Sequence, residues 1–249
     1  MKINDSHILI TGAARGIGRA LAQHLSENGA IVAAVDISKD GLAETETKET
    51  QIRPYVCDLG SSSNVIEVIE QIYKDLKSID IVINCAGIMH SEPVVRVGDN
   101  GYIAHDFGNW QQVISVNLNG VFFVTTCVLK KMVGQRTKGL IINFSSISAQ
   151  GNAGQSAYAA SKAGVEALTK TWAKEFGYLG IRSACISPGF IDTPATHAAL
   201  NEASLKSWAK KTPIKRLGTI AETISATQMI IENDFFNGRV LNLDGGLVI

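Results

Sequence analysis

TGAARGIG, at residues 11–18, is the stretch that decides the expected fold. The apolar run HILI precedes it, and GRALAQHLSEN continues from it with the spacing of an amphipathic helix. A glycine-rich turn between a strand and a helix lets the backbone approach a phosphate, and the helix N-terminus adds unpaired N–H groups and a positive dipole end. Glycines in this spacing are a weak signal on their own, so a simple tight turn remains an alternative.

Apolar runs of strand length recur along the whole chain, and their lack of polar alternation is typical of strands covered on both faces. They lie at 7–11, 30–36, 54–58, 79–84, 139–145, 181–187 and 239–244. Helix-period segments separate the runs, so strand and helix alternate. We therefore expect one α/β domain over residues 1–249, a Rossmann-like doubly wound fold with a seven-stranded parallel sheet flanked by helices.

Two stretches interrupt this alternation. Residues 88–108 form an extended loop, and residues 190–218 are punctuated by proline and glycine before the next helix. Long connections of this kind are usually functional or flexible.

The composition excludes several kinds of protein. The 23 basic and 23 acidic side chains give a formal net charge of zero, which argues against a nucleic-acid surface. No run reaches the roughly 18 apolar residues of a membrane span, and MKINDSH lacks the order of a signal peptide, so we expect a soluble, cytoplasmic protein without a membrane partner. The scattered cysteines are expected to be reduced core residues, and no spacing predicts a metal site. They are Cys57, Cys85, Cys127 and Cys185.

A carboxylate at the end of the second predicted strand bears on the choice of nucleotide cofactor. Asp36 follows Gly18 by 18 residues, near the distance at which an acidic side chain accepts both hydroxyls of an adenosine ribose. A 2′-phosphate beside Asp36 would bring like charges together, so NAD is favoured over NADP. Two alternatives stay open: Arg15 binds such a phosphate and offsets part of the repulsion, or Asp36 only caps the turn.

A tyrosine and a lysine share one face of a predicted helix in AYAASKAG. Tyr158 and Lys162 are four residues apart. A phenol is a poor base at neutral pH unless a nearby cation stabilises the phenolate, and a lysine supplies that cation. The spacing alone is not specific, because Tyr73 and Lys77 repeat it on an ordinary helix. Tyr158 differs in having a serine pair at a strand end shortly upstream.

Together these motifs resemble those of the short-chain dehydrogenases/reductases over nearly the whole chain. The resemblance rests on TGAARGIG, CDL, NCAG, VNLNG, the serine pair, YAASK and SPGFIDT. It implies an NAD(P)-dependent oxidoreductase that interconverts a ketone and a secondary alcohol. In that family a tyrosine is the acid/base, a lysine makes it more acidic and holds the nicotinamide ribose, a serine orients the substrate oxygen, and an asparagine holds a relay water. The matching positions are Asn117, Ser146, Tyr158 and Lys162.

The choice between the two serines stays open at the level of sequence. The family's usual interval before Tyr158 leads to Ser145, whereas the register of the strand IINFSS leads to Ser146. We favour Ser146, because adjacent strand residues face opposite ways and core packing sets the register.

The resemblance also implies the cofactor-binding positions. They are Gly12, Arg15, Gly16, Ile17, Gly18, Asp36, Ile37, Asp58, Leu59, Asn84, Ala86, Gly87, Tyr158, Lys162, Pro188, Gly189, Ile191 and Thr193. Asp58 matches an adenine-side acceptor, Asn84 and Ala86 the turn under the adenosine, and Thr193 a carboxamide or phosphate contact. Asp58 and Asn84 end predicted strands, where ligands bind in open α/β sheets. Each is alternatively an Asx-turn residue.

Within the family, GNAGQSAYAASKAG and SPGFIDTPAT most resemble the 3-oxoacyl-[acyl-carrier-protein] reductase-like branch. That likeness implies a 3-oxoacyl thioester substrate of fatty acid metabolism, carried on CoA or on acyl carrier protein. Residues 190–218 would form a substrate lid, with apolar side chains for an acyl chain and the basic run KKTPIKR for a carrier phosphate. The apolar side chains are Phe190, Leu200, Leu205 and Trp208.

Other functions stay open. Members of that branch commonly use NADPH, whereas Asp36 favours NAD, so an NAD-dependent 3-hydroxyacyl-CoA, polyol or other secondary alcohol dehydrogenase is an alternative. A non-catalytic dinucleotide-sensing or scaffolding protein is an alternative of another class. The helices expected at 109–134 and 153–178 match those through which family members pair, so a homotetramer or homodimer is expected.

Overall fold

The computed structural model describes residues 1–46, 50–99 and 101–249, and it confirms the expected seven-stranded parallel sheet. The strands are β1 (His7–Thr11), β2 (Ile31–Asp36), β3 (Ile52–Val56), β4 (Ile81–Asn84), β7 (Gly139–Phe144), β8 (Ile181–Pro188) and β9 (Val240–Leu243). They lie in the order β3-β2-β1-β4-β7-β8-β9, and each pair of neighbours is parallel. The chain therefore winds outward from β1 in one direction and then from β4 in the other.

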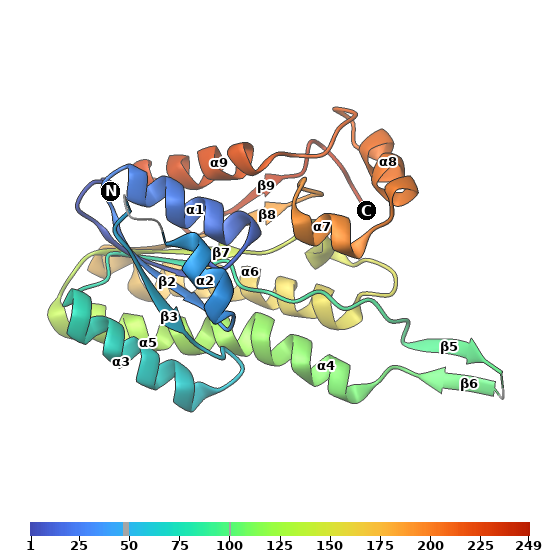
Figure 1. The fold of residues 1–249 in the computed structure, drawn as a ribbon, viewed down its shortest axis with the longest axis horizontal. Helices are drawn as coiled ribbons and strands as arrows, with labels where there is room; N and C mark the ends of the chain where they lie inside the picture. The colour runs from blue at the N-terminus through green and yellow to red at the C-terminus, as the bar shows by residue number, and fades with distance from the viewer. Residues whose placement is uncertain (47–49, 100) are drawn as a thin grey trace.

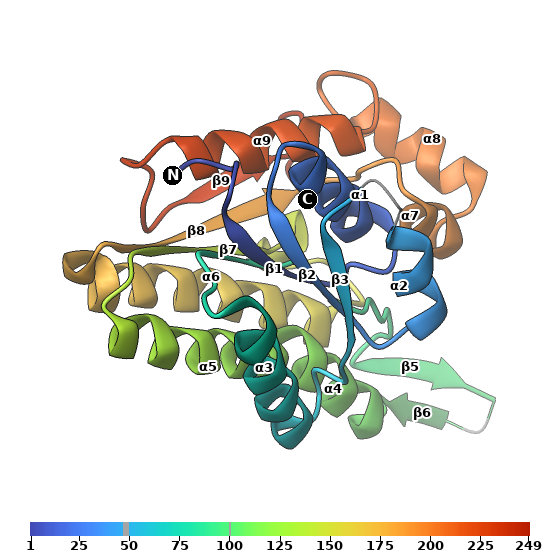
Figure 2. The same ribbon diagram turned by 60° about the vertical axis from the view of Figure 1, so that its left-hand side comes forward.

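Helices cover both faces of this sheet, as Figures 1 and 2 show. One face packs against α1 (Gly16–Glu27), α2 (Lys39–Thr45) and α9 (Ile220–Glu232). The other packs against α3 (Ser62–Leu76), α5 (Gly120–Gln135) and α6 (Ser156–Phe176). In β1, Ile8 and Ile10 pack into the first layer and Leu9 into the second. Because successive side chains of a strand point to opposite faces, a sheet covered on both sides needs apolar residues throughout.

The third strand was predicted at the wrong bounds. The apolar pattern favours 54–58, but β3 runs from Ile52 to Val56 and includes Pro54. A proline, which has no N–H to donate, is tolerated here because β3 is at the edge of the sheet and pairs only with β2. Cys57 follows the end of the strand and is also buried. The apolar pattern of the sequence therefore continues past β3, and the predicted strand ends too late.

The helix expected at 109–134 is interrupted. It consists of α4 (Phe107–Ile114), a π-helical turn at Ser115–Asn119, and α5. Among the described residues, Phe107–Gln135 is the one helical stretch long and apolar enough to cross a membrane by length and composition. Its side chains Val121, Val124 and Val128 are buried in the second core layer.

The extended loop expected at 88–108 contains a β-hairpin. β5 (Val95–Gly98) and β6 (Gly101–Ala104) form an antiparallel pair that projects from the body on the same side as α7 and α8 (Figures 1 and 2). The runs VVRV and GYIA on either side of a glycine-containing turn carry the signal for a hairpin. Val97 and Tyr102 face each other across the pair and are 79% and 82% exposed.

The segment 190–218 folds into α7 (Pro194–Ala199) and α8 (Glu202–Lys211). The ring of Phe190 stacks on that of Trp208 with centroids 4.5 Å apart, and Leu205 is buried. Two apolar side chains predicted for the lid therefore contact one another across the segment.

Candidate active site

The glycine-rich turn lies between β1 and α1 and packs against the end of β4. Gly12 and Gly16 have φ of +71° and +56°, a region that favours glycine. A Cβ on Gly12 would lie 2.7 Å from Ala86 Cα, and one on Gly18 would overlap the carbonyl oxygen of Gly12. The turn thus requires glycine for close approach as well as for backbone conformation.

The N-terminus of α1 is open to an anion. Arg15 is its N-cap residue, is exposed, and makes no side-chain capping bond within the part of the chain that the structure describes. A Cβ on Gly16 would meet no atom within 4 Å. Ile17, by contrast, is half-buried and packs against the first core layer. Unpaired N–H groups beside open space are what a pyrophosphate needs, so this turn fits the cofactor that the sequence implies.

Thr11 connects the glycine-rich turn to the turn that follows β4, a role that the sequence analysis did not predict. Its buried Oγ1 accepts hydrogen bonds from Cys85 N and Ala86 N, each at 3.2 Å. β1 and β4 are the neighbours at which the winding direction reverses, where open α/β sheets bind ligands. Its position as the last residue of a strand before a glycine turn was the available signal.

Asp36 ends β2 beside this turn. Its Oδ2 accepts a hydrogen bond from Ala14 N at 3.1 Å, and its Oδ1 accepts one from Ser38 N at 3.0 Å. The carboxylate therefore caps the turn and also lies against the glycine-rich segment. The next residue, Ile37, is 68% exposed.

Asp58 follows β3 and is exposed. Its Oδ1 accepts a hydrogen bond from Gly60 N at 2.9 Å, which is the Asx turn that the sequence left open. Leu59 is buried and lies against Gly120, where a Cβ would come within 3.0 Å of it. Of these two predicted positions, only Asp58 presents its side chain at the surface.

The side chain of Asn84 points away from the predicted cofactor site. Its Nδ2 donates to Asn143 Oδ1 at 2.8 Å and to Thr125 Oγ1 at 3.0 Å, and the residue is 1% exposed. Asn143 in turn donates to Thr169 Oγ1. These buried hydrogen bonds join β4 and β7 to the helices of the second layer. Any contact of Asn84 with a cofactor would have to come from its backbone.

Tyr158 and Lys162 lie on one face of α6. Lys162 is 4% exposed, its Nζ donates to Phe144 O at 2.8 Å, and Nζ is 5.7 Å from the centroid of the half-buried Tyr158 ring. The buried ammonium thus combines one fixed acceptor with a place beside the tyrosine. A nearby cation stabilises a phenolate, which is what proton exchange by a tyrosine requires.

The other Tyr-x-x-x-Lys pair has a different environment. Burial and the charge of Asp80 raise the pKa of Tyr73 above its ordinary value. Lys77 ends α3 with a φ of +70°, and its Nζ donates to Lys74 O. The Lys77 ammonium is thus bonded to the end of its own helix, and the cation near the Tyr73 ring is Lys131, whose Nζ lies 5.6 Å from the ring centroid.

Asn117 lies in the π-helical turn and is fully buried. Its Oδ1 accepts from Ile88 N and its Nδ2 donates to Ile88 O, each at 2.8 Å. A Cβ on Gly87 would lie 3.4 Å from both Asn117 Oδ1 and Lys162 Nζ. The structure therefore brings Gly87, Asn117 and Lys162 around one point, although they are far apart in sequence. π-Helical turns are frequent at functional sites.

The two serines at the end of β7 face opposite ways. Ser145 is buried, and its Oγ lies 2.8 Å from Glu166 Oε1 and 3.2 Å from Lys162 O. Ser146 is half-buried, and its Oγ accepts a hydrogen bond from Ser148 N at 3.2 Å. The accepted bond leaves the Ser146 hydroxyl proton available to a ligand, whereas the Ser145 hydroxyl is occupied within the protein.

The end of β8 supplies the remaining predicted positions. Pro188 is the last residue of the strand, and Gly189 N donates to Leu243 O at 2.9 Å. Ile191 is buried and forms a bridge with Gly218. Thr193 is buried as the N-cap of α7, where its Oγ1 accepts from Thr196 N.

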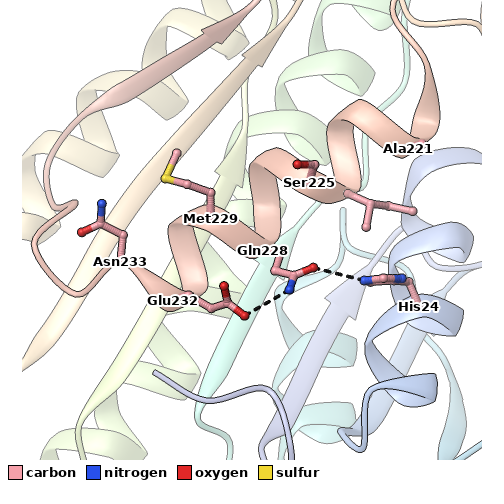
Figure 3. A pocket seen from close by; sticks show the side chains of 8 residues that line it. His24, Ala221, Ser225, Gln228, Met229, Glu232 and Asn233 are labelled. Carbon is pink, nitrogen blue, oxygen red and sulfur yellow. Dashed lines mark hydrogen bonds between the residues drawn. The ribbon is translucent and has the colours of Figure 1, made fainter.

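A groove elsewhere on the surface contains none of the predicted site residues. It is lined by His24 of α1 and by residues of α9 (Figure 3). Its polar side chains bond one another, with Gln228 joining His24 at 3.4 Å to Glu232 at 3.0 Å. The candidate active site is therefore at the carboxyl edge of the sheet and not in this groove.

The four cysteines are free thiols. Burial raises the pKa of Cys57 to about 11 and the pKa values of Cys85 and Cys185 to about 12. Cys85 and Cys127 are half-buried. Within the described ranges, no group of three or more His, Cys, Asp or Glu side chains is arranged to hold a metal ion.

Comparisons with known proteins agree with this geometry. A family model described as short chain dehydrogenase matches residues 6–204. The chain is 39% identical to the 3-oxoacyl-[acyl-carrier-protein] reductase FabG of Thermotoga maritima, with 100% of both proteins covered. It is 32% identical to the (3R)-3-hydroxyacyl-CoA dehydrogenase of Canis lupus familiaris, covering 99% of this chain and 98% of that protein. Among solved structures, the ligand-free aldohexose dehydrogenase of Thermoplasma acidophilum superposes with a TM-score of 0.86 at 30% identity, covering 98% of this chain and 94% of that one.

Proposed function

The chain belongs to the short-chain dehydrogenase family and is an NAD(P)-dependent oxidoreductase acting on CH–OH groups, and from that premise we propose that it reduces 3-oxoacyl thioesters to 3-hydroxyacyl thioesters. The observation that carries the proposal is the buried Lys162 ammonium beside Tyr158, in a chain that matches a 3-oxoacyl-[acyl-carrier-protein] reductase along its whole length. The thioester is carried on CoA or on acyl carrier protein.

NAD is the proposed cofactor. The turn at Gly12, Gly16 and Gly18 would hold its pyrophosphate at the N-terminus of α1. Asp36 would accept hydrogen bonds from the adenosine ribose, since a carboxylate that already accepts two backbone N–H groups retains further lone pairs. Ile37 and Asp58 are exposed beside it and would flank the adenine.

The remaining cofactor positions lie along the carboxyl edge. Ala86 and Gly87 follow β4, Gly189 follows β8, and Lys162 would hold the nicotinamide ribose. The Thr193 side chain caps α7 by accepting a hydrogen bond from Thr196 N. Its backbone is therefore the part that would contact the carboxamide.

The proposed mechanism assigns each proton movement to the protein's own residues. A nicotinamide cofactor held by the glycine-rich turn and Lys162 would supply hydride-transfer chemistry in either direction. Tyr158 donates its hydroxyl proton to the ketone oxygen, and the Lys162 ammonium stabilises the resulting phenolate. The Ser146 hydroxyl donates a hydrogen bond to the same oxygen, while Ser146 Oγ accepts one from Ser148 N. Asn117 lies beside Lys162 and would hold the water that returns a proton to the tyrosine.

The segment 190–218 is proposed as the substrate lid. The stacked rings of Phe190 and Trp208 offer apolar surface for an acyl chain. Lys211 Nζ lies 4.4 Å from the centroid of the Trp208 ring and would meet a carrier phosphate. Arg216 pairs with Glu222 at 2.6 Å, so the basic run contributes fewer available charges than the sequence suggests.

A second candidate, an NAD-linked 3-hydroxyacyl-CoA dehydrogenase, is favoured by Asp36 and by the 32% identical relative of that name. The two candidates catalyse the same reaction in opposite directions. One assay with a thioester substrate therefore distinguishes both of them from dehydrogenases that act on other alcohols.

The first experiment measures nicotinamide absorbance with acetoacetyl-CoA and either NADH or NADPH. We expect the protein to oxidise NADH, because Asp36 disfavours a 2′-phosphate. The reverse reaction, 3-hydroxybutyryl-CoA with NAD, is run beside it. Turnover of sugars or polyols with no turnover of either thioester would contradict the proposed substrate and leave the reaction class standing.

Assembly as a homodimer or homotetramer in the cytoplasm is also proposed. α5 buries Val124 and Val128 against the sheet, while Phe122 on the same helix is 45% exposed and is available to a second copy. Light scattering measures the mass directly, and a monomer at the working concentration of the assay would contradict the proposal.

A further inference from the structure

The residues that follow β4 lie against the loop that precedes α6. Glu92 N donates to Gly154 O at 2.7 Å. Gln155 Nε2 lies 3.1 Å from Ser91 Oγ and 3.5 Å from Met89 Sδ. Residues 88–92 therefore contact the loop through the backbone and through one glutamine side chain.

The side chain of Gln155 also reaches the turn that carries the candidate serine. Its Oε1 accepts hydrogen bonds from Ser148 Oγ at 2.9 Å and from Asn152 Nδ2 at 3.1 Å. Ser148 N in turn donates to Ser146 Oγ at 3.2 Å. One amide thus connects residues 89–91 on its nitrogen side with the 146–150 turn on its oxygen side.

The position of Gln155 at the start of α6 makes this arrangement informative. It is the N-cap residue of the helix that carries Tyr158, yet its side chain makes no capping bond. Ser, Thr, Asp and Asn are the residues that stabilise that position. The Gln155 side chain therefore does not cap the helix, and its hydrogen bonds go to residues 89–91, to Ser148 and to Asn152 in its own loop.

The far side of the contact is held in place by Glu92. Its Oε2 lies 3.1 Å from His90 Nε2 and 3.3 Å from Asn109 Nδ2, and its Oε1 accepts from Asp106 N at 3.3 Å. Its carbonyl oxygen lies 3.2 Å from His105 Nδ1. The base of the hairpin is thereby tied to α4, so it offers Gln155 a fixed surface.

We propose that Gln155 is a positioning residue, which holds Ser148 and through it the Ser146 hydroxyl in the orientation that a substrate oxygen requires. Ser148 contacts both residues, because its N–H donates to Ser146 Oγ and its Oγ donates to Gln155 Oε1. The inference rests on the proposed function in taking Ser146 as the substrate-orienting serine.

The test is a double-mutant cycle of Gln155→Ala and Ser148→Ala, with Gln71→Ala as the matched control. Gln71 is an exposed glutamine whose amide donates to Asp75 on its own helix at 2.9 Å. We expect each single variant to lower kcat about tenfold, with the KM for NADH unchanged, because a misplaced group costs rate more than cofactor binding. The double variant should equal the single ones, since both remove the same connection. Gln71→Ala should match the wild type.

A direct contact of Gln155 with substrate predicts something else, namely a raised KM for acetoacetyl-CoA and additive losses in the double variant. Either result would overturn the inference, as would a wild-type kcat in Gln155→Ala. A loss of kcat that follows a fall in Tm would also overturn it, because a structural role alone explains that pattern.

A second measurement does not depend on the substrate. Amide hydrogen exchange of the cofactor-free protein should be faster at 146–150 in Gln155→Ala and unchanged in β7 and β8. If hydrogen exchange at 146–150 is the same in Gln155→Ala as in the wild type, the inference is wrong, whether or not the protein reduces a thioester. If exchange rises while the wild type turns over no ketone, the positioning role stands and the proposed function fails.

Discussion

Tyr158→Phe is expected to lower kcat about 1000-fold while the Kd for NADH stays within about twofold of the wild type. The substitution removes the hydroxyl that donates the proton and keeps the ring. Without that donor the negative charge on the ketone oxygen has no acid to neutralise it, whereas Lys162 remains bonded to Phe144 O and stays in place for the ribose. Single-turnover absorbance with acetoacetyl-CoA measures the loss, and quenching of nicotinamide fluorescence measures binding.

Tyr73→Phe is the matched control, because the sequence repeats the Tyr-x-x-x-Lys spacing there. The Tyr73 hydroxyl is buried with no hydrogen-bond partner among the described residues, so removing it should leave kcat unchanged and should not lower the Tm. Retained turnover in Tyr158→Phe would contradict the assigned acid. Loss of NADH binding together with turnover would instead indicate a misfolded site.

Asp36→Ser is expected to shift cofactor preference by about 100-fold, measured as the ratio of kcat/KM for NADH to that for NADPH. Like charges brought together in a partly desolvated site cost several kcal/mol, and each 1.4 kcal/mol is tenfold. Removing the carboxylate abolishes this repulsion, and Arg15 at the N-terminus of α1 is then available to the 2′-phosphate.

The same substitution has a predictable structural cost. Asp36 accepts hydrogen bonds from Ala14 N and Ser38 N, so Asp36→Ser should lower the Tm with or without cofactor. Asp40→Ser is the control, since Asp40 is an exposed carboxylate in the first turn of α2 and lies close along the chain. A wild-type protein that prefers NADPH, or an unchanged ratio in Asp36→Ser, would contradict the role given to Asp36.

Much of the fold was predictable because its strands are buried on both faces. The runs around Leu9, Val82 and Ile141 are mainly apolar and do not alternate with polar residues, and in short segments bounded by turns that pattern is typical of central strands in a parallel sheet. The bounds of β3 were predicted less well, because an edge strand is covered less completely and tolerates Pro54.

The candidate site was predictable where a residue's type is tied to a backbone requirement. Gly12 and Gly16 need a left-handed backbone, and Asp36 needs only to end a strand beside them. Asn84 was harder, since its strand-end position is correct but its side chain turns into the core to meet Asn143. Which side of a strand end faces the cleft depends on the neighbouring strand and helix.

The alternation of strand and helix, the glycine turn and the pairing of Tyr158 with Lys162 were predictable, because they depend on local periodicity and on residues close along the chain. Contacts between distant segments are visible only in the folded chain: Asn117 and Gly87 lie near Lys162, Ser145 bonds Glu166, and Gln155 joins residues 89–91 to the turn after Ser146. Those contacts join segments that approach one another only after the sheet has formed. Their geometry follows from the packing of whole layers, which no short stretch of sequence encodes.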